Sequence, residues 1–153
     1  MIRSACVDDA VDATEVVRRS ISELCKADHQ DDPATLDRWL INKTPEKFKE
    51  WVSNPENFCV IAGDGARVFG VGLLKRSGEV LLFYVAPGYQ RLGIGHRIHD
   101  ALEAQATSWG LGRMYLESTA LACNFYRSLG YQSTGPERSL FGVLRVYPLA
   151  KAL

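Results

Sequence analysis

Two glycines one residue apart, Gly93 and Gly95, stand where a helix is predicted to begin, within the stretch Gln90-Arg91-Leu92-Gly93-Ile94-Gly95. Glycine costs conformational entropy at a helix start, so the pair indicates a need for bare backbone. The first turn of a helix points unpaired N–H groups outward, and its dipole is positive at that end. Without a Cβ in the way, a phosphate can approach those N–H groups. The stretch favours an anion site, with tight packing of the helix against a strand as the alternative.

Two common phosphate loops do not fit this stretch. A P-loop needs the pattern GxxxxGK[ST], but His96 and Arg97 follow the second glycine. A dinucleotide-binding fingerprint needs a third glycine three residues on, and that glycine is absent. By itself, a GxG pair at a helix start is a weak signal.

The residues around the glycines make the signal more specific. Val85-Ala86-Pro87, followed by Gln90, Gly93 and Gly95, resembles the acetyl-CoA-binding motif of the GNAT superfamily of N-acetyltransferases. Downstream, the run from Ala122 to Tyr131 (ACNFYRSLGY) is similar to the Ala-x-x-Phe-Tyr-x-x-x-Gly-Phe helix of the same family. One helix and one strand fit between the two motifs. The resemblance covers residues 57–131 well, and two motifs in the right order are far more specific than one.

The resemblance implies that acetyl-CoA lies in a gap between two splayed strands, 79–85 and 113–117. The residues implied to bind it are Val85, Gln90, Arg91, Leu92, Gly93, Ile94, Gly95, His96 and Thr119. Thr119 stands where many members carry an Asn that contacts the pantetheine arm. Its hydroxyl could make that contact or cap the following helix. No metal is implied.

The chemistry implied is the attack of an amine on a thioester. An alkyl amine has a pKa of about 10 and is mostly protonated at neutral pH, so a proton must be removed. Glu79, six residues before Val85, is the first candidate for the base, with a strand-end carboxylate facing solvent as the alternative. Glu117 is the second candidate, with a strand-end carboxylate paired with a lysine or arginine as the alternative. The Val85 backbone N–H is implied to stabilise the charge on the thioester oxygen. Tyr126 is implied to protonate the CoA sulfur, with a core aromatic role as its alternative.

The elements that must position these residues follow from hydrophobic periodicity and turn signals. Strands are expected at 2–7, 57–62, 67–75, 79–85, 113–117, 131–133 and 140–148, and helices at 9–26, from 33, from 44, at 93–109 and at 119–129. The step from strand 79–85 through helix 93–109 to strand 113–117 is the one parallel crossover. The chain is therefore predicted to be one α+β (mixed α/β) domain over residues 1–153. Its twisted mixed β-sheet has six to seven strands flanked by helices.

The composition narrows the functional classes. With 18 basic and 18 acidic residues among 153, the chain has no basic surplus that would indicate a nucleic-acid partner. No apolar run approaches the length of a membrane span, and no leader is evident, so a cytoplasmic protein is expected. The four cysteines are too far apart for a zinc site and are expected to be free, with Cys6 and Cys59 buried in strands.

The acceptor is the least defined part of the prediction. The segment from Cys25 to Asp32 is acidic, and we hypothesise that Asp28, Asp31 and Asp32 line the acceptor entrance and favour a cationic amine; a solvated loop is the alternative. Trp39 and Trp51 could line a pocket or the core, and His99 is expected to be exposed. The predicted function is acetyl transfer from acetyl-CoA to a primary amine of a small molecule or a protein, in a ternary complex. A non-catalytic CoA-binding regulatory domain is the alternative, and a homodimer is possible.

Overall fold

Two antiparallel four-stranded sheets carry the fold of the computed structural model, which describes residues 1–153. The first sheet has the order β1 (Ile2–Ser4), β2 (Asn57–Gly63), β3 (Val68–Lys75) and β4 (Val80–Val85). In the second, β8 (Leu144–Ala152) pairs with β5 (Arg113–Thr119), β6 (Gln132–Ser133) and β7 (Arg138–Leu140). Each sheet follows from short apolar runs separated by turns.

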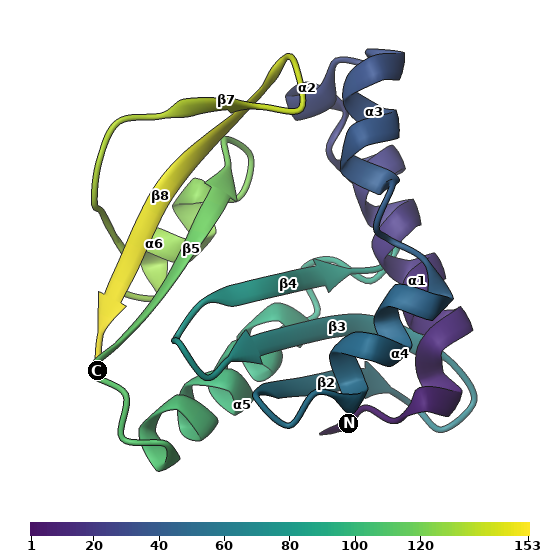
Figure 1. The fold of residues 1–153 in the computed structure, drawn as a ribbon, viewed down its shortest axis with the longest axis vertical. Helices are drawn as coiled ribbons and strands as arrows, with labels where there is room; N and C mark the ends of the chain where they lie inside the picture. Colours follow the sequence, from purple (N-terminus) through teal and green to yellow (C-terminus); the bar gives the residue numbers. More distant parts are fainter.

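The two sheets meet at one corner and then diverge. Glu79 and Tyr115 form a single parallel bridge, where the Tyr115 N–H donates to the Gly78 carbonyl at 3.0 Å. Beyond it β4 and β5 separate, which leaves the outer edge of β4 without a partner strand (Figure 1). The predicted α+β fold with splayed strands is confirmed. There are eight strands rather than six or seven, because the C-terminal segment forms β6, β7 and β8 instead of two strands.

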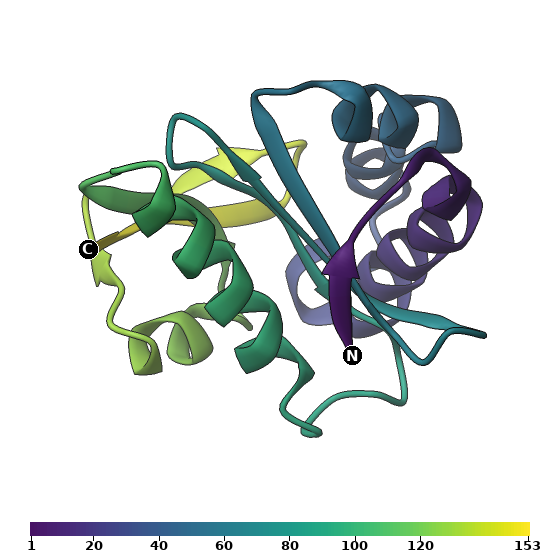
Figure 2. The same cartoon turned by 90° about the horizontal axis from the view of Figure 1, so that it is seen from below.

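Helices cover both faces of the first sheet. The N-terminal helices α1 (Ala10–Arg19), α3 (Pro33–Leu40) and α4 (Pro45–Ser53) gather on one side, and α5 (Ile94–Ser108) and α6 (Cys123–Ser128) on the other (Figure 2). The helix predicted at 9–26 is not continuous. A 3₁₀ turn (Val7–Asp9) precedes α1, a π-helical segment (Ser20–Leu24) follows it, and the short α2 (Lys26–His29) comes next.

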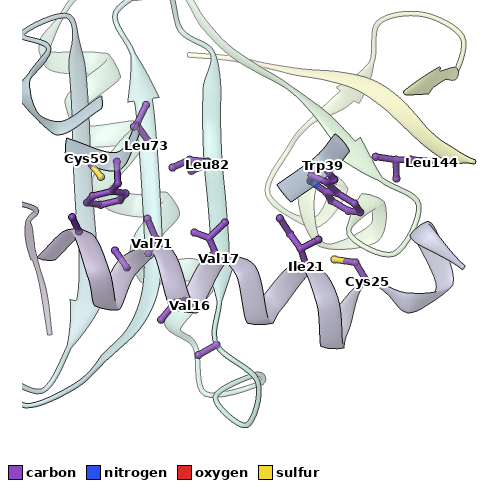
Figure 3. Packing of buried hydrophobic residues seen from close by; sticks show 14 of the residues in the cluster. Val16, Val17, Ile21, Cys25, Trp39, Cys59, Val71, Leu73, Leu82 and Leu144 are labelled. Carbon is purple, nitrogen blue, oxygen red and sulfur yellow. The ribbon is translucent and has the colours of Figure 1, made fainter. Parts of the chain in front are cut away.

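The N-terminal helices are held by the larger hydrophobic core. Val17 and Ile21 face Val71 and Leu82 across the helix–sheet interface (Figure 3). Trp39 is only 5% exposed in this core, and Trp51 packs against its edge. Both tryptophans therefore serve the core.

Two strand glycines bring α5 close to the sheet. A Cβ on Gly70 would lie 2.8 Å from the Ile98 side chain, and one on Gly72 would lie 2.4 Å from it. Only glycine allows this approach, so β3 sets the height of α5 above the sheet. This contact places the first turn of α5 beside the end of β4.

The cysteines correct one expectation. All four are free, and Cys59 is buried in β2 as expected. Cys6 is exposed, because β1 ends at Ser4 and the chain turns into the 3₁₀ segment. None of the helices combines the length and apolar character needed to cross a membrane.

Candidate functional site

A cleft of about 630 Å³, here called the α5 cleft, opens where β4 gives way to α5. It is lined by the end of β4, the loop 86–93, the first turn of α5 and one side of α6. Phe125 lies on its wall: its ring is 5.7 Å from that of Phe83 and 5.3 Å from that of His96. Phe125 packs against the edge of the second hydrophobic core and also lines the cleft.

Unpaired backbone N–H groups edge the α5 cleft. From Gln90 to His96 no backbone N–H donates to a protein acceptor, and the next N–H along the chain, that of Arg97, donates to the Gly93 carbonyl. Gly93 precedes α5 with φ +80°, a conformation that L side chains rarely adopt, and Arg91 also has positive φ (64°). The glycine is therefore required by the backbone, and the free amides form a site suited to a phosphate.

Seven of the nine residues predicted to bind CoA line the α5 cleft: Val85, Gln90, Arg91, Gly93, Ile94, Gly95 and His96. Leu92 is not among the lining residues and is 64% exposed. The Gln90 side-chain oxygen accepts the Gly88 N–H at 2.7 Å, so this side chain also orders the loop. Thr119 lies elsewhere, at the end of β5, where its hydroxyl oxygen accepts the Ala122 N–H at 3.2 Å.

A second cleft of about 210 Å³, the β4–β5 cleft, occupies the gap between the splayed strands. Ser20 and Leu24 line it from the π-helical segment, Cys25 from the residue that follows this segment, and Leu81 from β4. Leu73 pairs with Leu82 and Leu74 with Val80, so Leu81 is the extra residue of a β-bulge. Bulges re-aim side chains, and π-helical turns are frequent at functional sites. No sequence pattern signalled either feature.

The two clefts share five lining residues: Phe83, Val85, Leu121, Ala122 and Tyr126. Tyr126 is 7% exposed, and burial, with smaller contributions from Tyr84 and Tyr131, raises the pKa of its hydroxyl well above the ordinary value. The hydroxyl therefore keeps its proton at neutral pH and can offer it in a hydrogen bond. A molecule that passes from one cleft to the other must cross this junction.

The Val85 N–H points into the gap. The neighbouring Ala86 N–H donates to Phe69 on β3 at 2.9 Å. Successive N–H groups along a strand point to opposite sides, so the Val85 N–H faces away from β3, toward the unpaired edge of β4. It is available to an oxygen at the junction.

The two candidate bases occupy different places. Glu79 lines neither cleft; it lies at the joined end of β4 and β5, with its carboxylate 3.4 Å from the Lys75 ammonium. Glu117 is the only carboxylate among the residues that line the β4–β5 cleft. Its two oxygens accept from the Arg138 guanidinium at 2.5 and 2.6 Å, and this ion pair compensates its charge.

The acidic segment is not the predicted acceptor entrance. Cys25 lines the β4–β5 cleft, but Asp28, Asp31 and Asp32 do not. Asp32 caps α3 by accepting the Thr35 N–H and hydroxyl. Asp28 is buried, facing the backbone N–H groups of Leu121 and Ala120, and burial raises its pKa. The prediction that these carboxylates line the entrance is wrong, because Asp32 caps a helix, Asp28 is buried against the loop before α6, and none of the three lines the cleft.

Two histidines are more deeply buried than the sequence suggested. His29, in α2, is fully buried; its Nε2–H donates to the Ile21 carbonyl at 3.1 Å and its Nδ1 accepts the Asp31 N–H. His99 was expected on the exposed side of its helix but is 1% exposed, with Nε2 2.8 Å from the Tyr131 hydroxyl. The β5–β8 sheet and α6 cover that side of α5, which local periodicity could not show. No group of three or more His, Cys, Asp or Glu side chains is arranged to hold a metal ion.

The comparisons with known proteins agree with this geometry. The sequence model of the acetyltransferase (GNAT) domain matches residues 25–151. A candidate acetyltransferase of Bacillus subtilis (strain 168) is 29% identical over 76 residues; the match spans 50% of this chain and about half (52%) of that relative.

Solved structures share the fold at low sequence identity. A GCN5-related N-acetyltransferase from Rhodopseudomonas palustris superposes with a TM-score of 0.88 at 22% identity, covering 100% of this chain and 95% of that one. The PaiA N-acetyltransferase from Thermoplasma acidophilum, solved with coenzyme A, gives 0.81 at 19% identity, covering 100% and 98%. An aminoglycoside 6′-N-acetyltransferase complexed with coenzyme A gives 0.75 at 18% identity, covering 99% and 96%.

Proposed function

The chain belongs to the GNAT acetyltransferase family, and from this premise we propose that it transfers the acetyl group of acetyl-CoA to a primary amine. The observation that carries the proposal is the junction of the two clefts at Tyr126. One cleft suits the donor and the other the acceptor, and both open onto the same hydroxyl and the same free N–H.

The α5 cleft suits the chemistry of coenzyme A. Seven successive residues with free backbone N–H groups, 90–96, present donors and a positive helix end to a pyrophosphate. Arg91 and His96 line the same cleft and can approach phosphate oxygens. Two related structures were solved with coenzyme A, which supports the same donor here.

The residues at the junction fit the reaction. Acetyl-CoA supplies an activated acetyl group as its thioester. The amine nitrogen forms a bond to the carbonyl carbon while the Val85 N–H stabilises the charge that grows on the carbonyl oxygen. The carbon–sulfur bond breaks, its electron pair goes to sulfur, and the Tyr126 hydroxyl donates a proton there. Tyr126 regains a proton that the acceptor nitrogen loses, directly or through water.

An acceptor that arrives as an ammonium must first lose a proton. Glu79 is the candidate by its strand position and would act through water, since it lies outside both clefts. Glu117 is the candidate by its place in the β4–β5 cleft. Both carboxylates are already paired with a cation, Lys75 and Arg138 respectively.

Two measurements on the purified chain test the proposal. Calorimetric titration with coenzyme A reports donor binding, and release of free thiol from acetyl-CoA over a panel of amines reports transfer. We expect binding and amine-dependent thiol release, with the acetylated amine identified by mass spectrometry. Binding without turnover on any amine would favour a regulatory CoA-binding domain, and absence of binding would reject the donor.

A further inference from the structure

The β4–β5 cleft is built for an apolar molecule. We infer that the acceptor is a compact amine carried on an apolar body, bound in this cleft as the uncharged free base. This inference rests on the proposed function, and it names the acceptor class that the family assignment leaves open. It also replaces the cationic acceptor that the acidic segment had suggested.

The walls of the cleft are mostly apolar. Eleven of its fifteen lining residues are hydrophobic, and they come from every element around it. Leu24 projects from the π-helical segment, and the bulged Leu81 comes from β4. Cys25 belongs to the same wall, and burial raises the pKa of its thiol to about 12, so the group is neutral. Such a surface favours an apolar ligand.

Three of the four residues with short polar or charged side chains that line the cleft already have partners, and Ser20 is the fourth. Ser118 donates its hydroxyl to the Thr119 carbonyl at 2.7 Å, and the Thr119 hydroxyl accepts the Ala122 N–H. Glu117 is paired with Arg138 through both oxygens. An acceptor with several ammonium or hydroxyl groups would lose its hydration and find few partners. The lining therefore selects against polyamines and aminoglycosides.

The size of the cleft points the same way. At about 210 Å³ it lies below the roughly 300–1,000 Å³ usual for drug-sized ligands. A body of one alkyl chain or one aromatic ring is the appropriate scale.

An apolar cleft also changes the protonation of its ligand. Burial disfavours the charged form of an amine, so an ammonium that enters without an unpaired carboxylate nearby loses affinity relative to its free base. The only carboxylate on the wall is the one held by Arg138. Asp28 lies behind the wall, close enough to act on the Cys25 thiol, and burial raises the pKa of its carboxyl above the ordinary value, which disfavours its charged form. The cleft thus selects the nucleophilic form, which reduces the need for a dedicated base.

A graded series of amines tests the inference. The purified enzyme is assayed for kcat/KM, with acetyl-CoA saturating, on n-propylamine to n-hexylamine, 2-phenylethylamine, ethanolamine, 1,3-diaminopropane and spermidine. We expect kcat/KM to rise about four-fold per added methylene until the cleft is full. The kcat/KM for 2-phenylethylamine should exceed that for 1,3-diaminopropane and for spermidine by at least about a hundred-fold, because the contributions of several buried apolar carbons multiply.

The protonation part is tested by pH profiles on two amines of similar shape, 2-phenylethylamine and its less basic 2,2-difluoro analogue. If the free base binds, the midpoint of log kcat/KM moves with the pKa of the amine. A common midpoint for both would instead identify a group on the enzyme and overturn this part.

A variant pair localises the effect. Leu24→Asp places a carboxylate on the cleft wall, while Ile41→Asp adds the same charge at a position that is 77% exposed and outside both clefts. We expect Leu24→Asp to lower kcat/KM for n-hexylamine at least about ten-fold, which corresponds to the loss of two to three buried methylenes. The ratio of kcat/KM for n-hexylamine to that for 1,3-diaminopropane should also fall. Ile41→Asp should change neither, and the thermal midpoint of each variant reports folding.

The outcomes separate the two proposals. Turnover that favours spermidine, the diamine or ethanolamine, or that ignores chain length, would overturn the acceptor class while leaving acetyl transfer intact. Failure to bind coenzyme A, or to release thiol with any amine, would reject the proposed function itself.

Discussion

The two clefts that meet at Tyr126 are built in different ways. The α5 cleft takes most of its lining from residues 83–96, one continuous stretch, and offers backbone N–H groups. The β4–β5 cleft takes its lining from the π-helical segment, β4, β5 and the start of α6, and offers side chains. Backbone donors can bind a phosphate in any sequence that adopts the turn. The ligand preference of a cleft lined by side chains, in contrast, depends on which residues line it. The same fold can therefore keep one donor and vary its acceptor.

The largest effect is expected at the junction, which belongs to both clefts. Tyr126→Phe removes the hydroxyl and keeps the ring, so kcat should fall about a hundred-fold while the affinity for coenzyme A stays within about two-fold. A thiol has a pKa of about 8.5, so its thiolate can leave without full protonation. The fall in kcat should therefore be at the lower end of the range found when a general acid is removed. Single-turnover rates and calorimetry measure the two quantities.

The matched control is Tyr115→Phe. Its hydroxyl donates to Ser77 at 3.2 Å, at the joined end of the strands, and it lines neither cleft. A similar kcat for both variants would remove Tyr126 from the proposed chemistry.

The next effect separates a backbone site from a side-chain site. Gly93→Val forces a branched residue into φ +80° beside the free amides. The KM for acetyl-CoA should rise about ten- to thirty-fold, because one or two hydrogen bonds to a charged phosphate would be lost. Steady-state kinetics at fixed acceptor measure it. KM for the acceptor should change little.

Gly65→Val controls for strain alone. Gly65 has φ +92° and open space around it, but it lies in the β2–β3 turn, outside both clefts. Equal rises in KM for acetyl-CoA would mean that backbone strain, and not the phosphate site, explains the result.

A smaller effect is expected from the carboxylates, because the free base needs little help. Glu117→Gln should lower kcat/KM for an apolar amine less than about ten-fold, the scale of an altered cleft wall, and Glu79→Gln should lower it less still. Both are measured across pH on 2-phenylethylamine. A loss near a hundred-fold for Glu79→Gln, with a flattened acid limb, would identify it as a base acting through water.

The sequence predicted the α5 cleft far better than the β4–β5 cleft, for a physical reason. Glycines at a helix start, a preceding apolar strand and the Phe125-Tyr126 helix are local signals, and they predicted the splayed strands and the fold. The wall formed by Leu24 and Leu81 depends on a π-helical turn and a bulge, which no local pattern announced. Asp28 was predicted to line the acceptor entrance, with a solvated loop as the alternative, because its burial depends on a loop about ninety residues away.

The smallest effect is expected on stability, from the contact between His99 and Tyr131 behind the α5 cleft. The glycine motif at the start of α5 does not encode this contact. His99 lies on α5, hydrogen-bonded to Tyr131 and beside the Phe83 ring. Its charged or titratable neighbours are Glu103, Lys151, Asp100 and His96. Burial lowers the pKa of His99 below its ordinary value of 6.5. As pH falls below that value, the unfolded chain binds a proton that the folded ring refuses, so the free energy of unfolding decreases until the folded pKa is reached.

His99→Gln removes this proton and keeps a polar group near the Tyr131 hydroxyl. Between about pH 7.5 and about pH 5.5, the wild-type chain should lose stability more steeply than the variant, by at most about 1.4 kcal/mol per pH unit for one proton. Urea unfolding at several pH values measures both slopes, and the other titrating groups cancel in their difference. Parallel slopes would show that His99 titrates alike in both states. A steeper wild-type slope would show that the folded chain holds His99 unprotonated where α5 packs against the chain after α6.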